Sequence, residues 1–145
     1  MAIKKNNKAE PQWTYNGEIV DDISKTPKDS FSFIYKITLE DGRYYFGKKF
    51  MWKPKYTSGV KKGQSKGQYP WQNYKGSSKT LLEFLKIGMG YSKEILQFCY
   101  SKAETTYEES RIILCSNGLV DPNCFNFWVS CKVYAKNLQK IGEKD

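Results

Sequence analysis

Two tyrosines, Tyr35 and Tyr45, stand on either side of a tight Glu-Asp-Gly turn, and the lysines Lys48 and Lys49 follow. The chain has no histidine, which excludes catalytic triads that use imidazole as the base. Its four cysteines lack the CxxC spacing of a zinc site and are expected to be reduced thiols. The groups that remain as candidates for catalysis are phenols, ammonium groups and carboxylates. They suit phosphodiester hydrolysis, which needs a base for water, a cation for the developing charge and a carboxylate that holds a divalent metal.

A long basic segment follows the second tyrosine. Residues 48–79 hold nine lysines, six aromatic residues and no aspartate or glutamate, in a chain of net charge +9. Lysines beside aromatic surfaces are typical of nucleic-acid binding, whereas a solvated loop is the plainer alternative. The expected partner is DNA, most simply double-stranded, with RNA or another anionic partner as alternatives. The residues assigned to this contact are Lys48, Lys53, Lys55, Lys61, Lys62, Lys66, Lys75, Trp52, Trp71 and Tyr74.

The length of 145 residues predicts a single domain. We expect a polar, partly disordered lead-in over residues 1–30, a folded domain over residues 31–135 and a charged tail over residues 136–145. No apolar run is long enough for a membrane span, and the first residues lack the apolar segment of a secretory signal. The expectation is a soluble, cytoplasmic protein without a membrane partner.

The turn between the tyrosines decides which side chains share a face. A two-residue Asp-Gly loop would place Thr38 opposite Tyr45. A three-residue Glu-Asp-Gly loop, closed by a left-handed glycine, would place Tyr35 opposite Gly47 instead. Only the second register puts Tyr35, Tyr45 and Lys49 on one face of the hairpin.

Hydrophobic periodicity and capping residues indicate an α/β (α+β) fold. The expected architecture is an antiparallel three-stranded sheet flanked by helices. The expected elements are strands over 31–39, 44–49 and 92–100, a long loop over 50–77, a helix between Ser77 or Ser78 and Gly88 or Gly90, a helix that starts near Ser101 and ends before Gly118, and an extended C-terminal piece. A continuation of the first helix is the alternative for residues 92–100, and the glycines at 88 and 90 argue against it.

The tripeptides FIY at 33–35 and YFG at 45–47 resemble the signature hairpin of the GIY-YIG nucleases. This family includes phage homing endonucleases, some restriction enzymes and the N-terminal nuclease of excision repair. An apolar strand, a helix carrying Glu109 and a later Phe-Asn dipeptide at 125–126 follow in the family's order. The stretches NYKGSSK and TYEES are similar to small phage-encoded members. The resemblance covers about residues 31–130.

The resemblance implies a role for each matching residue. Tyr35 and Tyr45 flank the scissile phosphate, and one of them acts as the general base or assists it. Glu109 binds the divalent metal, Mg²⁺ or Mn²⁺. Asn126 orients the site or its hydrogen-bond network, with the stabilisation of a turn as the plainer alternative.

This chain departs from the family pattern in two places. Phe33 replaces the first glycine of the motif, and the arginine expected on the helix after the hairpin is missing. A lysine must replace the arginine, as a point charge without the bidentate fork. Lys49 is the first candidate; the alternatives are Lys48, Lys53, Lys55 and Lys75. Glu104 and Glu108 compete with Glu109 for the metal, and the spacing to Ile113 favours Glu109.

The resulting hypothesis is a metal-dependent DNA endonuclease of low sequence specificity, unless a homodimer or a partner adds recognition. A nucleic-acid-binding module that has lost cleavage is the alternative, and the missing arginine supports it. A third hypothesis is an inhibitor that binds a host protein through its aromatic residues.

Overall fold

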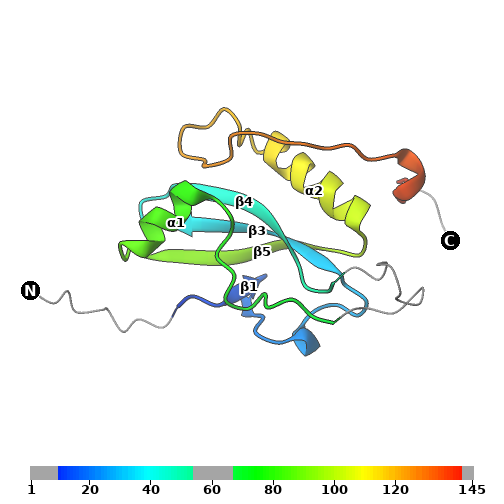
Figure 1. The fold of residues 1–145 in the computed structure, drawn as a ribbon, viewed down its shortest axis with the longest axis horizontal. Helices are drawn as coiled ribbons and strands as arrows, with labels where there is room; N and C mark the ends of the chain where they lie inside the picture. Colours follow the sequence, from blue (N-terminus) through cyan, green and yellow to red (C-terminus); the bar gives the residue numbers. More distant parts are fainter. Residues whose placement is uncertain (1–9, 54–66, 142–145) are drawn as a thin grey trace, which may run out of the picture.

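The computed structural model describes residues 10–53 and 67–141 of the chain. It has a mixed α+β fold in which five strands form one sheet, in the order β2-β1-β5-β3-β4 (Figure 1). Strand β1 pairs in parallel with β5, and the other neighbouring pairs are antiparallel. The elements are β1 (Trp13–Tyr15), β2 (Glu18–Ile19), η1 (Ile23–Lys25), β3 (Ser32–Leu39), β4 (Tyr44–Phe50), α1 (Lys79–Lys86), β5 (Tyr91–Cys99), α2 (Lys102–Cys115) and η2 (Ala135–Asn137).

The sheet extends beyond the three predicted strands because β1 and β2 come from the segment expected to be a lead-in. Trp13 is 1% exposed and packs on Phe33, with ring centroids 4.9 Å apart. Its indole Nε1 donates a hydrogen bond to the carbonyl oxygen of Trp71 at 2.8 Å. The folded domain therefore starts before residue 31. Strands this short carry too few residues for an alternating pattern to show in the sequence.

The hairpin of β3 and β4 adopts the register that requires a three-residue loop. Tyr35 lies opposite Gly47, and Ile37 lies opposite Tyr45. Gly42 has φ +92°, the left-handed conformation that closes such a loop, and its N–H donates to the carbonyl of Leu39 at 2.9 Å. This register is confirmed, and the two-residue alternative is wrong.

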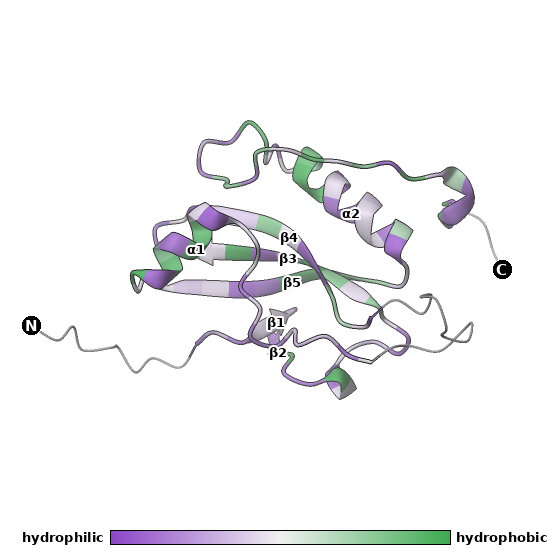
Figure 2. Ribbon diagram, in the orientation of Figure 1, coloured by the Kyte–Doolittle hydropathy of each residue, from purple (hydrophilic) through white to green (hydrophobic). Residues whose placement is uncertain are grey.

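The sheet is covered on two faces. On one face the rings of Trp13, Phe33 and Tyr35 form the main core together with Trp71 and Leu81. On the other, α2 packs near β4, where Ile113, Phe46 and Cys124 form a smaller cluster. Figure 2 shows hydrophobic residues along β3 and at the C-terminal end of α2. Strand β3 is central and buried from both sides.

Both main helices begin at serine caps. The hydroxyl of Ser78 accepts a hydrogen bond from the N–H of Leu81, and that of Ser101 accepts one from the N–H of Glu104. After α2 the chain returns alongside this helix toward η2 (Figure 1). None of the helices in the described ranges has the length and apolar character needed to cross a membrane.

Candidate active site

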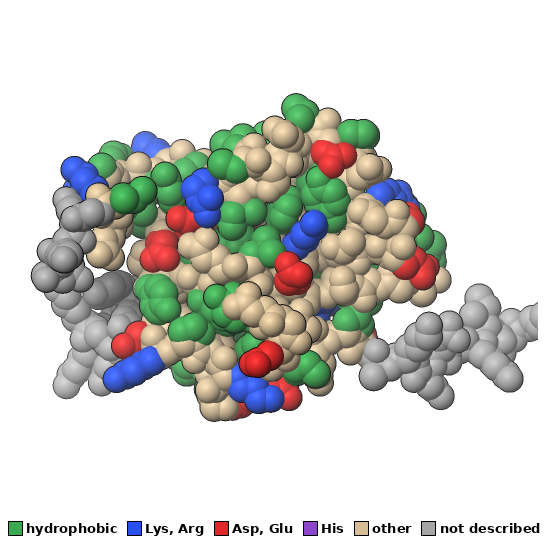
Figure 3. All heavy atoms as spheres, turned by 180° about the vertical axis from the view of Figure 1, so that it is seen from behind, with side chains coloured by type: hydrophobic (Ala, Val, Ile, Leu, Met, Phe, Trp, Pro, Cys, Tyr) green, Lys and Arg blue, Asp and Glu red, His purple; other side chains and the backbone are tan. Residues whose placement is uncertain are grey.

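A cleft of about 840 Å³ opens where α2, the segment before α1 and the segment after α2 meet the edge of β4. The residues that the sequence predicted as catalytic all line it: Tyr35, Tyr45, Lys49, Glu109 and Asn126. They come from four separate parts of the chain. On the face turned away in Figure 1, described acidic and basic side chains are interspersed and do not form a patch of one sign (Figure 3).

The two tyrosines face each other across the hairpin. Their ring centroids are 6.3 Å apart, and Tyr35 is 1% exposed. The hydroxyl of Tyr35 occupies the place that a side chain on Gly47 would take, since a Cβ atom there would overlap both the hydroxyl and Cζ. The missing side chain at residue 47 lets a phenol from the sheet interior reach the cleft beside the edge strand.

Burial makes both phenols harder to ionise. Burial raises the pKa of Tyr35 well above 10.0, and the neighbouring phenols of Tyr74 and Tyr45 raise it further. Burial also raises the pKa of Tyr45, although a hydrogen bond of 3.5 Å with the Ser77 hydroxyl opposes this effect. In this environment the phenols are hydrogen-bond donors, and a nearby cation is needed before either one can give up its proton.

Glu109 reaches the cleft from α2. Thr105 and Ile113, four residues to either side, are buried, so all three lie on the helix face that packs on the sheet. The side chain of Glu109 is 21% exposed, and its Oε1 lies 3.8 Å from Nζ of Lys48. Burial raises the pKa of this carboxyl group, and Lys48 opposes the shift.

The two competing glutamates lie elsewhere. Glu108 accepts a hydrogen bond from Nε of Arg111 at 2.6 Å, and Glu104 accepts one from the N–H of Tyr100 at 3.4 Å. Both line a different hollow, between α2 and the C-terminal segment. Of the three candidates, Glu109 is the one that lines the cleft of the tyrosines.

Among the residues that the structure describes, three lysines line the cleft. Nζ of Lys49 lies 4.4 Å from the centroid of the Tyr74 ring, and burial lowers its pKa. Lys48 pairs with Glu109. Lys79, the first residue of α1, completes the set and was missed by the sequence analysis. The predicted Ser78 cap was the available signal, because it placed Lys79 in the first turn of the helix after the hairpin, on which the resemblance expected an arginine.

Three of the predicted nucleic-acid contacts, Trp71, Trp52 and Lys53, lie away from the cleft. Trp71 is 0% exposed and belongs to the core, so its ring is not available to a ligand on the surface, and this assignment is wrong. Trp52 packs against the same core and, together with Lys53, lines a separate hollow near Phe31. Tyr74 does line the cleft.

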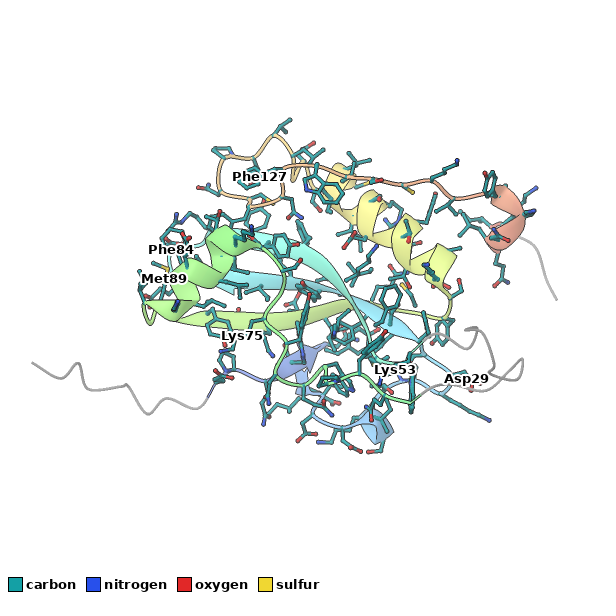
Figure 4. All side chains as sticks on the ribbon, viewed as in Figure 1. Asp29, Lys53, Lys75, Phe84, Met89 and Phe127 are labelled. Atoms are coloured by element: carbon teal, nitrogen blue, oxygen red, sulfur yellow. The ribbon has the colours of Figure 1, made fainter. Side chains whose placement is uncertain are left out.

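Lys75 is also outside the cleft. Its ammonium group forms an ion pair with the carboxylate of Glu10. Figure 4 shows that Lys75 and Lys53 lie apart on the molecule. Four further predicted contacts fall outside the described residues: Lys55, Lys61, Lys62 and Lys66.

Asn126 holds the segment after α2 against the edge of β4. Its Nδ2 donates to the carbonyl of Phe46 at 2.8 Å, and its Oδ1 accepts from the N–H of Phe46 at 2.9 Å. The side-chain amide therefore continues a backbone pairing in which Tyr44 bonds to residues 123 and 125. Since both polar atoms are engaged by the backbone beside Tyr45, we interpret Asn126 as a positioning residue.

The carboxylate of Glu109 suits one kind of metal site. Within the part of the chain that the structure describes, no three His, Cys, Asp or Glu side chains gather as a metal cage. Mg²⁺ is commonly held by one or two carboxylates, with water and substrate phosphate completing its shell. A single carboxylate in an open cleft fits this pattern.

One comparison with known proteins decides the family. A family model described as "Putative endonuclease segE, GIY-YIG domain" matches residues 13–138. The chain belongs to the GIY-YIG endonuclease family. The match begins at Trp13, the first residue of β1, so the short N-terminal strands lie within the GIY-YIG domain. DNA is the substrate that membership of this endonuclease family implies. No match was found among curated proteins or among solved structures.

Proposed function

We propose that this GIY-YIG protein is a metal-dependent endonuclease that hydrolyses DNA phosphodiester bonds in the cleft beside β4. The observation that supports the proposal is the convergence of Tyr35, Tyr45 and Glu109 in one cleft with lysines. These groups come from separate elements. Packing of the core alone does not require two phenols, a carboxylate and ammonium groups to meet at one opening.

The charges of the cleft suit a sugar-phosphate strand. Among its described lining residues, Lys48, Lys49 and Lys79 outnumber the single carboxylate of Glu109. The lysines bind phosphates of the strand, and Lys48 opposes the rise that burial causes in the pKa of Glu109. A divalent ion at Glu109, Mg²⁺ or Mn²⁺, would supply the charge that stabilises the phosphorane and acidifies the attacking water.

The two tyrosines take different parts in the reaction. Tyr45 is only partly buried and its hydroxyl faces the cleft, so water and a cation bound there can reach it. Tyr35 is locked in the core and offers its hydroxyl at a fixed point next to Gly47. Tyr45 therefore assists the base, and Tyr35 orients the phosphate or the water as a hydrogen-bond donor.

The cleft residues predict low sequence specificity. Lysine contacts to phosphates give affinity without reading the bases. Recognition of a particular site therefore depends on a second copy of the chain or on a partner.

Nicking of supercoiled plasmid in the presence of Mg²⁺ tests the proposal. Glu109→Ala is expected to abolish nicking, whereas Glu108→Ala, one residue along the same helix but outside the cleft, is expected to retain it. Mn²⁺ is expected to replace Mg²⁺, and chelation to stop the reaction. Tight DNA binding without nicking at any metal concentration would instead identify a binding module that has lost cleavage. An equal loss of nicking in both variants would contradict a specific role for Glu109 in binding the metal.

A further inference from the structure

Two consecutive aromatic residues stand exposed at the mouth of the cleft. Phe127 is 75% exposed and Trp128 is 74% exposed, and both line the cleft. Figure 4 shows Phe127 on the loop that follows α2. Within the described part of the chain, neither ring takes part in a ring–ring or cation–π contact. Their faces are open to a ligand.

The other aromatic residues of the cleft are already engaged. The ring of Tyr35 packs against Tyr45 and Tyr74, and Lys49 lies over Tyr74. Phe127 and Trp128 are held differently, because they follow directly on Asn126 and its two hydrogen bonds to the backbone of Phe46. Both rings are largely exposed and are not part of the hydrophobic core. Their backbone is fixed at one point, so the rings are presented to the cleft at little cost in conformational entropy.

The lysines beside the rings identify the kind of occupant. A ligand that neutralises Lys48, Lys49 and Lys79 and also offers flat apolar faces is a nucleic acid. In paired DNA the neighbouring base pairs cover those faces. The faces of an unpaired base are open, and an aromatic side chain can stack on them.

We propose that Phe127 and Trp128 stack on unpaired bases next to the bond that is cut, so that the preferred substrate is DNA with an unpaired or displaced strand. This inference rests on the proposed nuclease function and specifies its substrate class. It also assigns a role in substrate specificity to Phe127 and Trp128, which have no part in the proposed hydrolysis. Other exposed apolar side chains, such as Val120 and Ile87, do not line the cleft and have no part in it.

Fluorescence anisotropy with labelled DNA, in buffer without divalent metal, tests the proposal. The probes are a perfectly paired duplex and the same duplex with a three-nucleotide bulge. The protein is expected to bind the bulged probe about 10-fold more tightly. Phe127→Ala and Trp128→Ala are each expected to weaken binding to the bulged probe by about 5- to 10-fold, which removes most of the preference, and binding to the paired probe by less than about 2-fold. Trp128→Phe keeps a flat ring and is expected to retain most of the preference.

Tyr134→Ala is the matched control, because Tyr134 is 57% exposed and does not line the cleft. It is expected to leave both affinities unchanged. Equal affinity of the protein for the two probes would overturn the inference, and plasmid nicking would show whether the nuclease proposal still holds. An equal loss on both probes in Trp128→Ala would also overturn it. So would a change from dimer to monomer in that variant, measured by sedimentation, because the rings would then form an interface between copies.

Discussion

The phenol of Tyr35 fills the space above the backbone of Gly47 on the neighbouring strand. The register of the hairpin sets these residues opposite each other, and the glycine leaves the hydroxyl room to reach the cleft. Tyr45, two residues earlier on the same strand, shares this face. One local feature, the three-residue turn, thus brings together the two phenols that the proposed reaction uses.

Gly47→Ala is expected to lower the free energy of unfolding by about 1–3 kcal/mol and to abolish nicking. Tyr35 is fully buried and cannot move aside, so the new methyl group forces the strands apart. Gly90→Ala is the matched control, since the nearest atoms to its Cβ belong to the flexible side chain of Glu40, with the carboxylate oxygen closest at 3.0 Å. Urea denaturation and the plasmid assay measure the two effects. Removing the hydroxyl in a Tyr35→Phe/Gly47→Ala double variant is not expected to restore stability, because Cζ also overlaps the new atom.

Tyr45→Phe is expected to slow nicking by about 100-fold or more while DNA affinity and stability change little. The lost group is a hydroxyl in the cleft that bonds only weakly to Ser77. Tyr44→Phe is the comparison, since the Tyr44 hydroxyl hydrogen-bonds to Asp121 away from the cleft. Single-turnover rates should separate the two variants. Equal rates would remove Tyr45 from the proton transfer.

Asn126→Leu is expected to reduce stability by about 2–4 kcal/mol, because it leaves the N–H and carbonyl of Phe46 without partners in a buried place. If Asn126 acts by holding β4 in place, the folded fraction of the variant is expected to nick DNA more slowly, because Tyr45 is displaced. The metal dependence of nicking is expected to stay the same. Asn123→Ala, an exposed change in the same segment, serves as the control. Measuring thermal unfolding and nicking activity on the same samples separates the loss of stability from the loss of rate. Full stability with no activity would instead indicate direct contact with substrate.

What could be predicted from the sequence was local. The Glu-Asp-Gly turn and the period of two narrowed the register to two choices, and serines indicated both helix starts, with Ser77 or Ser78 for the first and Ser101 for the second. The position of Glu109 followed from its spacing to Ile113 on one helix face. These features depend on neighbours in the chain, whose types and spacing are visible in the sequence.

What the sequence left hidden depends on long-range packing. Strand β1 is three residues long and is stabilised by Trp13 against Phe33, far along the chain. Trp71 lies in a basic, aromatic segment whose composition suggested a surface, but it fills the core beneath that segment. Periodicity cannot show either contact, because each depends on where a non-repeating segment folds back.

Lys79→Ala is expected to reduce the slope of log K against log salt for DNA binding by about 0.9, because one phosphate contact is lost. Lys75→Ala is expected to leave the slope unchanged, since that ammonium group lies outside the cleft and pairs with Glu10. Titrations of a short duplex between low and moderate salt, without divalent metal, give both slopes. A larger effect at Lys75 than at Lys79 would place the DNA on the surface that carries Lys75 and not in the cleft.

The burial of Lys93 predicts a pH dependence of stability. It is 3% exposed, and its ammonium group donates to the carbonyls of Gln72 and Tyr74 at 2.9 and 3.0 Å, which ties the segment carrying Tyr74 to β5. Burial lowers its pKa from 10.5 to about 8. Between these values the unfolded chain binds more protons than the folded one, so stability rises with pH through this window.

The rise from pH 8 to pH 10 is expected to be about 2 kcal/mol greater in the native protein than in Lys93→Met. The buried tyrosines, whose raised pKa values act in the opposite direction above pH 10, are common to both proteins and cancel in the difference. Urea midpoints at pH 7, 8, 9 and 10 provide the measurement. Lys102→Met, at the exposed first position of α2, is the control and should follow the native profile. Parallel profiles for the native protein and Lys93→Met would mean that Lys93 stays charged in the fold, held by the two carbonyls and by the Trp13 ring 4.2 Å from its nitrogen.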